Sequence, residues 1–166
     1  CRGREPRILT GRTDCPMTIC PEMRCTGCGA CQSACTAGCI TLVLNSAGDR
    51  VAVIDESRCT HCGKSSRGCP GLHPPVLRES TTALAAYAAE AQVRQSSASG
   101  GAAAVLARQV AESGGCAYGA AFTAPTTVEL VRVDTPADLP RLQGSKYVHA
   151  ATGSAYRQVQ SDLNAG

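Results

Sequence analysis

Four cysteines follow one another at a spacing that suits iron–sulfur chemistry. They are Cys25, Cys28, Cys31 and Cys35, in the order C-x2-C-x2-C-x3-C. This is the bacterial run for cubane clusters, in which three thiolates bind one cluster from a single loop and the fourth reaches a second cluster. The run therefore predicts two cluster sites that exchange a cysteine.

A second run begins 34 residues after the first. Cys59, Cys62 and Cys69 repeat three of its positions, and Pro70 follows, but the third position holds Ser65. A soft thiolate suits iron in a sulfide cluster, whereas a serine alkoxide is a harder and more basic ligand. We therefore expect the second site to hold a [3Fe–4S] cluster, a labile cluster or none.

Zinc and disulfide bonds are the alternative explanations for these cysteines. Eleven of the 12 cysteines lie within residues 1–69, and only Cys116 lies beyond. Zinc favours two cysteine pairs that make one tetrahedral site, and disulfide scaffolds are usually short secreted chains. We expect iron–sulfur clusters instead.

Cys39, four residues after Cys35, is either a replacement ligand for the second site or a partly buried free thiol.

The elements around the cysteines indicate a small domain. The short β-branched runs at residues 40–44 and 51–54 flank a turn with Gly48, which predicts a strand–turn–strand unit. The duplicated cysteine run around this hairpin predicts a compact pseudo-twofold domain over residues 21–72. Residues 1–20 have no periodicity, and we expect a disordered tail there.

The rest of the chain indicates an α+β protein whose second domain is small. Residues 73–98 are predicted to be a linker followed by a helix at 81–95. Residues 99–166 form an α/β pattern, with helices at 99–113, from 135 to Gly144 and from Ser154, and strands at 116–122 and 128–133. A final helix normally feeds a further strand. We therefore expect the natural protein to continue and this second domain to be incomplete.

Composition argues against several functions. Aromatic residues are 3% of the chain and the net charge is only +3, which argues against nucleic-acid binding. No apolar run approaches the roughly 18 residues of a membrane span, and no signal peptide is visible, which favours the cytoplasm. His61, His73 and His149 have no partners at catalytic spacing, so we expect no catalytic residues in this chain.

Residues 25–70 resemble a two-cluster bacterial ferredoxin domain. Thr36 departs from the family pattern, which has proline after the fourth cysteine of the run. The resemblance implies one [4Fe–4S] cluster on Cys25, Cys28, Cys31 and Cys69. It implies a second cluster on Cys35, Cys59 and Cys62, with Ser65 at the position of the fourth ligand.

The second half has a resemblance of its own, carried by three short motifs at residues 95–101, 115–122 and 142–148. In this order, behind a cysteine repeat, they are similar to the coenzyme F420 hydrogenase/dehydrogenase beta-subunit family. The resemblance implies FAD in the full-length protein, electron exchange with a deazaflavin, and a redox partner protein or subunit. It also implies that this chain alone is inactive.

Four residues of the second half suggest a flavin-binding site. Ser99, Gly100 and Gly101 open a helix, whose free N–H groups could receive a phosphate or a flavin edge, and Lys146 could neutralise its charge. An alternative of equal weight is that Ser99, Gly100 and Gly101 form a simple helix cap and loop and that Lys146 is a surface lysine. We therefore consider three functions. They are part of a flavin-dependent oxidoreductase, a ferredoxin-like carrier and docking module without catalysis, and a zinc-stabilised interaction protein.

Overall fold

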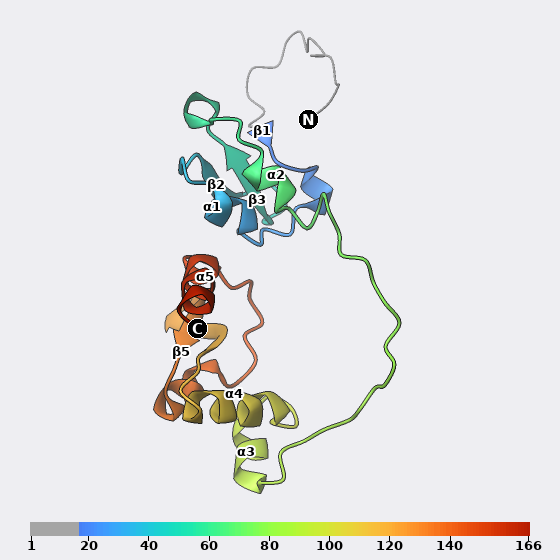
Figure 1. Ribbon diagram of the computed structural model, residues 1–166, viewed down its shortest axis with the longest axis vertical. Coiled ribbons are helices and arrows are strands. Elements are labelled where there is room, and N and C mark those ends of the chain that lie inside the picture. The colour runs from blue at the N-terminus through green and yellow to red at the C-terminus, as the bar shows by residue number, and fades with distance from the viewer. Residues whose placement is uncertain (1–16) are drawn as a thin grey trace. The chain divides into compact units, whose positions relative to one another are not determined.

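The computed structural model describes residues 17–166 and divides the chain into two units, Cys1–Leu77 and Arg78–Gly166. Figure 1 traces both from blue to red. Most of the predicted disordered tail, residues 1–16, lies outside the described residues. The prediction is wrong for residues 17–20, because Met17–Thr18 forms strand β1 and Cys20 is buried.

A three-stranded antiparallel sheet organises the first unit. Its order is β1-β3-β2, with β2 at Ile40–Leu44 and β3 at Arg50–Ile54. Leu42 lies opposite Ala52, so the two strands are in register as a hairpin. The strand–turn–strand prediction is confirmed. The added strand β1 pairs with β3 and brings the chain before the first cysteine run into the fold.

The two cysteine runs share one local structure, in which a 3₁₀ turn precedes the first cysteine and a short α-helix precedes the last. The turns are η1 (Glu22–Arg24) and η2 (Glu56–Arg58), and the helices are α1 (Ala30–Ala34) and α2 (Lys64–Arg67). The left-handed glycines Gly29 and Gly63 start the two helices. The sequence repeat is therefore a structural repeat.

The core of the first unit is small and contains two cysteines. Cys31, Cys39, Ile40 and Ala52 are all buried and pack together between the two runs. Because these side chains come from α1, from the segment before β2 and from the hairpin, the core joins the elements that carry the cysteines.

The helix predicted at residues 81–95 is wrong over most of its length. Only Ala91–Ser96 is helical, as α3. Leu84 and Tyr87, two of the residues that suggested an apolar face, are 87% and 73% exposed. An alanine-rich segment without an apolar surface to cover is too short to hold a helix by propensity alone.

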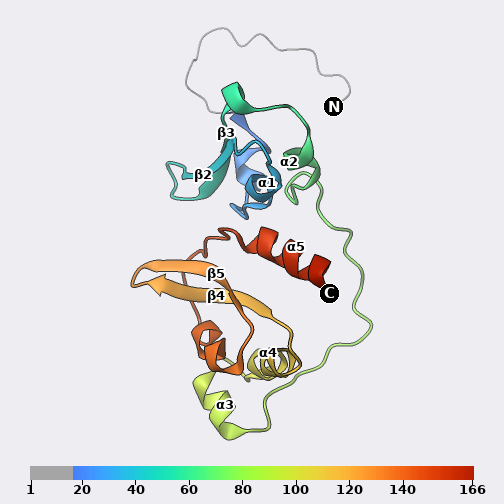
Figure 2. The same cartoon turned by 60° about the vertical axis from the view of Figure 1, so that its left-hand side comes forward.

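The second unit is built on the hairpin of β4 (Ala117–Ala124) and β5 (Thr127–Val133). Helix α5 (Ala155–Ala165) lies on one side of it, and α4 (Ala102–Glu112) with the 3₁₀ helix η3 (Pro136–Leu142) lies on the other, as Figure 2 shows. These elements match the predicted order. No helix in residues 17–166 has the length and apolar character that a membrane crossing requires.

Helix α5 packs through a different face from the predicted one. Its spacing suggested that Tyr156, Val159 and Leu163 point inward, yet Leu163 is 75% exposed. Ala155 is buried and Val159 and Asp162 are half-buried, at spacings of four and three residues. A carboxylate therefore occupies the inner face of this helix.

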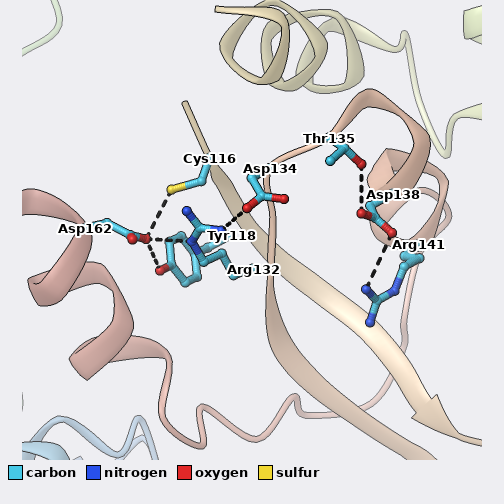
Figure 3. Close-up of polar contacts among 8 residues, drawn as sticks. All are labelled: Cys116, Tyr118, Arg132, Asp134, Thr135, Asp138, Arg141 and Asp162. Carbon is cyan, nitrogen blue, oxygen red and sulfur yellow. Dashed lines mark hydrogen bonds and ion pairs between the residues drawn. The ribbon is translucent and has the colours of Figure 1, made fainter. Parts of the chain in front are cut away.

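Asp162 joins α5 to the hairpin (Figure 3). Its Oδ2 accepts hydrogen bonds from Tyr118 Oη at 2.5 Å, Arg132 Nε at 2.9 Å and Cys116 Sγ at 3.2 Å. Arg132 also forms an ion pair with Asp134. Tyr118 on β4, Arg132 on β5 and Cys116 just before β4 thus converge on one oxygen of the helix.

The network sets the protonation of its members. The hydrogen bond from Tyr118, followed by those from Arg132 and Cys116, lowers the pKa of Asp162 to about 2. Burial and then the Asp162 carboxylate raise the pKa of Cys116 and raise that of Tyr118 to about 12. The Cys116 thiol therefore stays protonated near neutral pH, and the cluster works as a docking network rather than as a nucleophile.

We predict that α5 loosens from the hairpin when Asp162 loses its charge. A carboxylate whose pKa is lowered by folding stabilises the fold above its unfolded value and loses that contribution as the pH falls toward the folded value. The amide NMR signals of α5 should therefore lose protection between about pH 5 and pH 2. Asp162→Asn should show faster hydrogen exchange in α5 already at pH 7.

Asp138→Asn, which removes a carboxylate of η3 outside this network, is the matched control and should leave exchange in α5 unchanged. Equal exchange in α5 for the wild type and Asp162→Asn would contradict the docking role.

The loop of the first run brings Gly27 close to the backbone of Arg50 at the start of β3. Gly27 has a φ of +62°, and a Cβ there would lie 2.7 Å from both the Cβ and the carbonyl oxygen of Arg50. Gly48 has a φ of +86° with nothing within 4 Å, so Gly48→Ala isolates the conformational cost. We predict that both substitutions to alanine destabilise the chain, by roughly 1–2 kcal/mol for Gly48→Ala.

Gly27→Ala should cost about 1–3 kcal/mol more, the usual penalty of overpacking. The thermal unfolding midpoint measured anaerobically should therefore be lower for Gly27→Ala than for Gly48→Ala. Equal midpoints for the two variants would mean that β3 shifts to make room for the methyl group at position 27.

Candidate metal centres

The first cysteine pocket is a cavity of about 340 Å³, open mouth included, lined by Cys20, Cys25, Cys28, Cys31 and Cys69. The loop after η1 supplies Cys25 and Cys28, and α1 supplies Cys31. Cys69 follows α2 and comes from the second run. The structure thus brings together all four side chains predicted for the first cluster.

The thiols of this pocket are largely withdrawn from water. Cys31 is 8% exposed and Cys69 is 9% exposed. Burial raises the pKa of Cys31 to about 11, although the backbone N–H of Gln32 acts in the opposite direction. The Cys31 sulfur therefore carries a proton in the metal-free protein, and metal binding must release it.

The second cysteine pocket is wider, about 860 Å³ with its open mouth, and its cysteines are Cys35, Cys39, Cys59 and Cys62. Ser65 lines it at the position that Cys31 holds in the first pocket. The structure therefore brings Cys35 to the second run, as the spacing predicted. The last cysteine of each run therefore lines the pocket of the other run.

Backbone donors favour thiolates in the second pocket. The N–H of Lys64 is the main cause that lowers the pKa of Cys62, which is exposed, and burial opposes it. Burial raises the pKa of Cys35, but the N–H groups of Cys39, Ala37 and Gly38 outweigh it, so the net pKa is lowered. N–H groups directed at a thiolate are also the donors that stabilise an anionic cluster.

Two buried cysteines that do not stand at motif positions also line the pockets. Cys20, which we had placed in a disordered tail, is 6% exposed and lines the first pocket. Burial, followed by the Cys69 thiol, raises the pKa of Cys20 to about 12. Cys39 is 4% exposed and lines the second pocket. The spacing of Cys20 gave no signal, because it precedes the motif, whereas Cys39 was visible as an extra cysteine beside Cys35.

The repeat extends to the backbone of the two loops. Gly27 has a left-handed φ of +62°, and His61, 34 residues later, has a φ of +51°. His61 is the only residue other than glycine with a positive φ in residues 17–166. The loop shape is therefore kept in the second run even though a histidine must adopt it.

The donor set fits a multinuclear iron–sulfur cluster in each pocket. All ten cysteines in residues 17–166 are free thiols, so disulfides do not occupy them. Within the same residues no three cysteine, histidine or carboxylate side chains gather closely enough to chelate a single metal ion. Soft thiolates spread around a cavity suit an iron–sulfur cluster.

Two of the four residues proposed for a flavin line a third pocket, in the second unit. This pocket is about 1110 Å³ with its open mouth, and Ser99 and Gly101 line it at the start of α4. Gly100 instead packs against Tyr87, and its carbonyl accepts from the N–H of Ala88. Lys146 does not line the pocket.

The ammonium of Lys146 already has acceptors on the chain. Its Nζ donates to the carbonyl oxygens of Gln143 at 2.6 Å and Arg141 at 3.2 Å, at the end of η3. Gln143 and Gly144 line the third pocket, so the lysine fixes one wall of it. A direct contact between Lys146 and a cofactor stays a prediction.

Comparison with known proteins bears on the first unit. Residues 24–71 match the protein family described as a 4Fe-4S dicluster domain. Among curated proteins and among solved structures the chain has no significant match. The matched segment spans both cysteine runs and the hairpin between them. Residues 24–71 are therefore a 4Fe–4S dicluster ferredoxin domain, a domain type that implies two [4Fe–4S] clusters and serves electron transfer.

Proposed function

We propose that this chain is the iron–sulfur relay portion of a flavin-linked oxidoreductase. The observation that carries the proposal is the pair of cysteine pockets in one small domain, each lined by cysteines from both runs. Two redox sites in one rigid unit suit the passage of single electrons. A redox partner protein or subunit must deliver or accept them.

In this proposal the two sites have defined ligands. Cys25, Cys28, Cys31 and Cys69 hold the first cluster, and Cys35, Cys59 and Cys62 hold the second. The clusters supply reversible one-electron chemistry when bound. The chain supplies the thiolates, the N–H groups that face them, and a shared core with Cys31 and Ala52 that keeps water from the space between the pockets.

The flavin part of the proposal rests on the third pocket. Without its open mouth the pocket measures about 510 Å³, which lies within the range for cofactor sites. The start of α4 contributes Ser99 and Gly101, and η3 contributes Leu142, so segments from two of the motifs that resemble the coenzyme F420 hydrogenase/dehydrogenase beta-subunit family meet there. A flavin would convert single electrons into a two-electron step with a deazaflavin.

The competing proposal is a ferredoxin-like carrier whose second unit serves only for docking. Anaerobic purification followed by iron, acid-labile sulfide and flavin analysis separates the two. Iron and sulfide with FAD supports the flavin-linked relay. Iron and sulfide without any affinity for FAD supports the carrier, and zinc without sulfide would contradict both.

We predict that the last cysteine of each run serves the other site. In the double variant Cys25→Ala/Cys69→Ala both lost ligands belong to one site, so one intact [4Fe–4S] site should survive. In Cys59→Ala/Cys69→Ala each site loses a ligand, so none should survive intact. EPR of the reduced protein, together with iron counts, distinguishes these results, and the reverse pattern would show that the ligands do not cross.

We also predict that the third pocket binds FAD. Ala107 lines this pocket on α4, and Ala107→Leu should fill part of it. Its affinity for FAD, followed by the quenching of flavin fluorescence, should fall at least about tenfold, or about 1.4 kcal/mol. Gln109→Leu places the same new side chain at an exposed position of the same helix and should leave the affinity unchanged. Equal affinities in the two variants would exclude this pocket.

A further inference from the structure

We propose that Cys39, and not Ser65, provides the fourth thiolate of the second cluster site. The inference rests on the proposed iron–sulfur function and deepens it. The second run lacks a cysteine at its third position, yet the domain type implies two complete [4Fe–4S] clusters. The structure offers a thiol to fill the gap from outside the repeat.

The Cys39 thiol already lies among the sulfurs of the second pocket. Its Sγ is 3.3 Å from the Sγ of Cys35. The Cys59 thiol interacts with it as well. The residue is 4% exposed and lines the second pocket beside both of them. The Cys39 thiol therefore has a cysteine of each run as a neighbour.

The backbone holds Cys39 in place. Its carbonyl oxygen accepts the N–H of Asp55 at 2.8 Å, which extends the pairing of β2 with β3. The loop between Cys35 and Cys39 turns through Gly38, whose φ is +62°, and Arg58 Nη2 donates to the carbonyl of Ala37 at 3.1 Å. The return of the chain to the pocket is therefore a fixed feature of the fold.

Other donors in the pocket are weaker candidates. Ser65 would have to bind as an alkoxide, a harder ligand than iron in a sulfide cluster prefers. The hydroxyl of Ser66 donates to the carbonyl of Gly63 at 3.0 Å and is already engaged. His61 is exposed and held in a left-handed conformation. Cys39 alone among these side chains offers a soft, buried ligand.

Ligation by Cys39 is a simple exchange. The thiol proton leaves to solvent as the bond from Sγ to iron forms, and no oxidant or reductant is consumed. Cys35 and Cys39 must bind different irons, so their sulfurs must separate. A cysteine side chain turns about one torsion between staggered positions. The separation can therefore occur without movement of the backbone.

The test counts iron and acid-labile sulfide and records EPR spectra of the anaerobically purified full chain. The wild type should hold about eight irons and show no [3Fe–4S] signal when oxidised. Cys39→Ala should lose at least one iron and show that signal, or lose the second cluster altogether. Ser65→Ala should keep the wild-type count. Cys39→Ala/Ser65→Cys should recover it, because the thiolate is then at the position used in the first run.

The matched control is Cys20→Ala. Cys20 is as buried as Cys39 and touches the first pocket, but that pocket has four motif cysteines without it, so its loss should leave the iron count unchanged. If Cys39→Ala fails to fold, Ser65→Ala decides alone: a loss of iron there overturns the proposal, and an unchanged count supports it.

Two results overturn the inference while the proposed function stands. They are an intact second cluster in Cys39→Ala and a wild type that already shows a [3Fe–4S] signal, with the first [4Fe–4S] cluster present in both cases. A chain that binds no iron and no sulfide at all would instead contradict the proposed function. The two failures are therefore distinguishable.

Discussion

The first unit depends on one constraint: cysteines from two runs far apart in the sequence must line the same cavities. The antiparallel pairing of β2 with β3 meets this constraint, because it returns the chain and sets the second run beside the first. Gly27 must then approach Arg50 closely, and Cys31 and Cys39 must pack against Ala52. The metal sites and the core are thus the same group of side chains, so loss of either disturbs the other.

The cysteine pattern predicted much of this unit, because ligand spacing is local information. It predicted the hairpin, the repeat and the grouping of Cys69 with the first run. It did not predict β1 or the burial of Cys20, because a two-residue strand has no periodicity to detect. The placement of Cys39 depends on the turn at Gly38 and on Arg58, which is a tertiary contact 21 residues away along the chain.

The second unit was predicted less well because its signals were misleading. Alanines at residues 83–89 favour a helix by propensity, but Leu84 and Tyr87 remain largely exposed, and the segment stays irregular. In α5 the apolar pattern pointed to Tyr156 and Leu163, whereas the fold turns Asp162 inward. A charged residue on an inner face is recognised only when its donors, here on β4 and β5, are seen.

The two cysteine pockets differ in their depth below the surface. Cys31 and Cys69 are buried, whereas Cys62 in the second pocket is exposed and lies next to Lys64. The rate of electron tunnelling falls steeply with the distance between donor and acceptor. In the proposed relay, a partner that meets the surface beside Cys62 would exchange electrons faster with the second site than with the first, whose Cys31 and Cys69 are buried. The exposed loop at residues 60–64 would then be the point at which electrons enter or leave the domain.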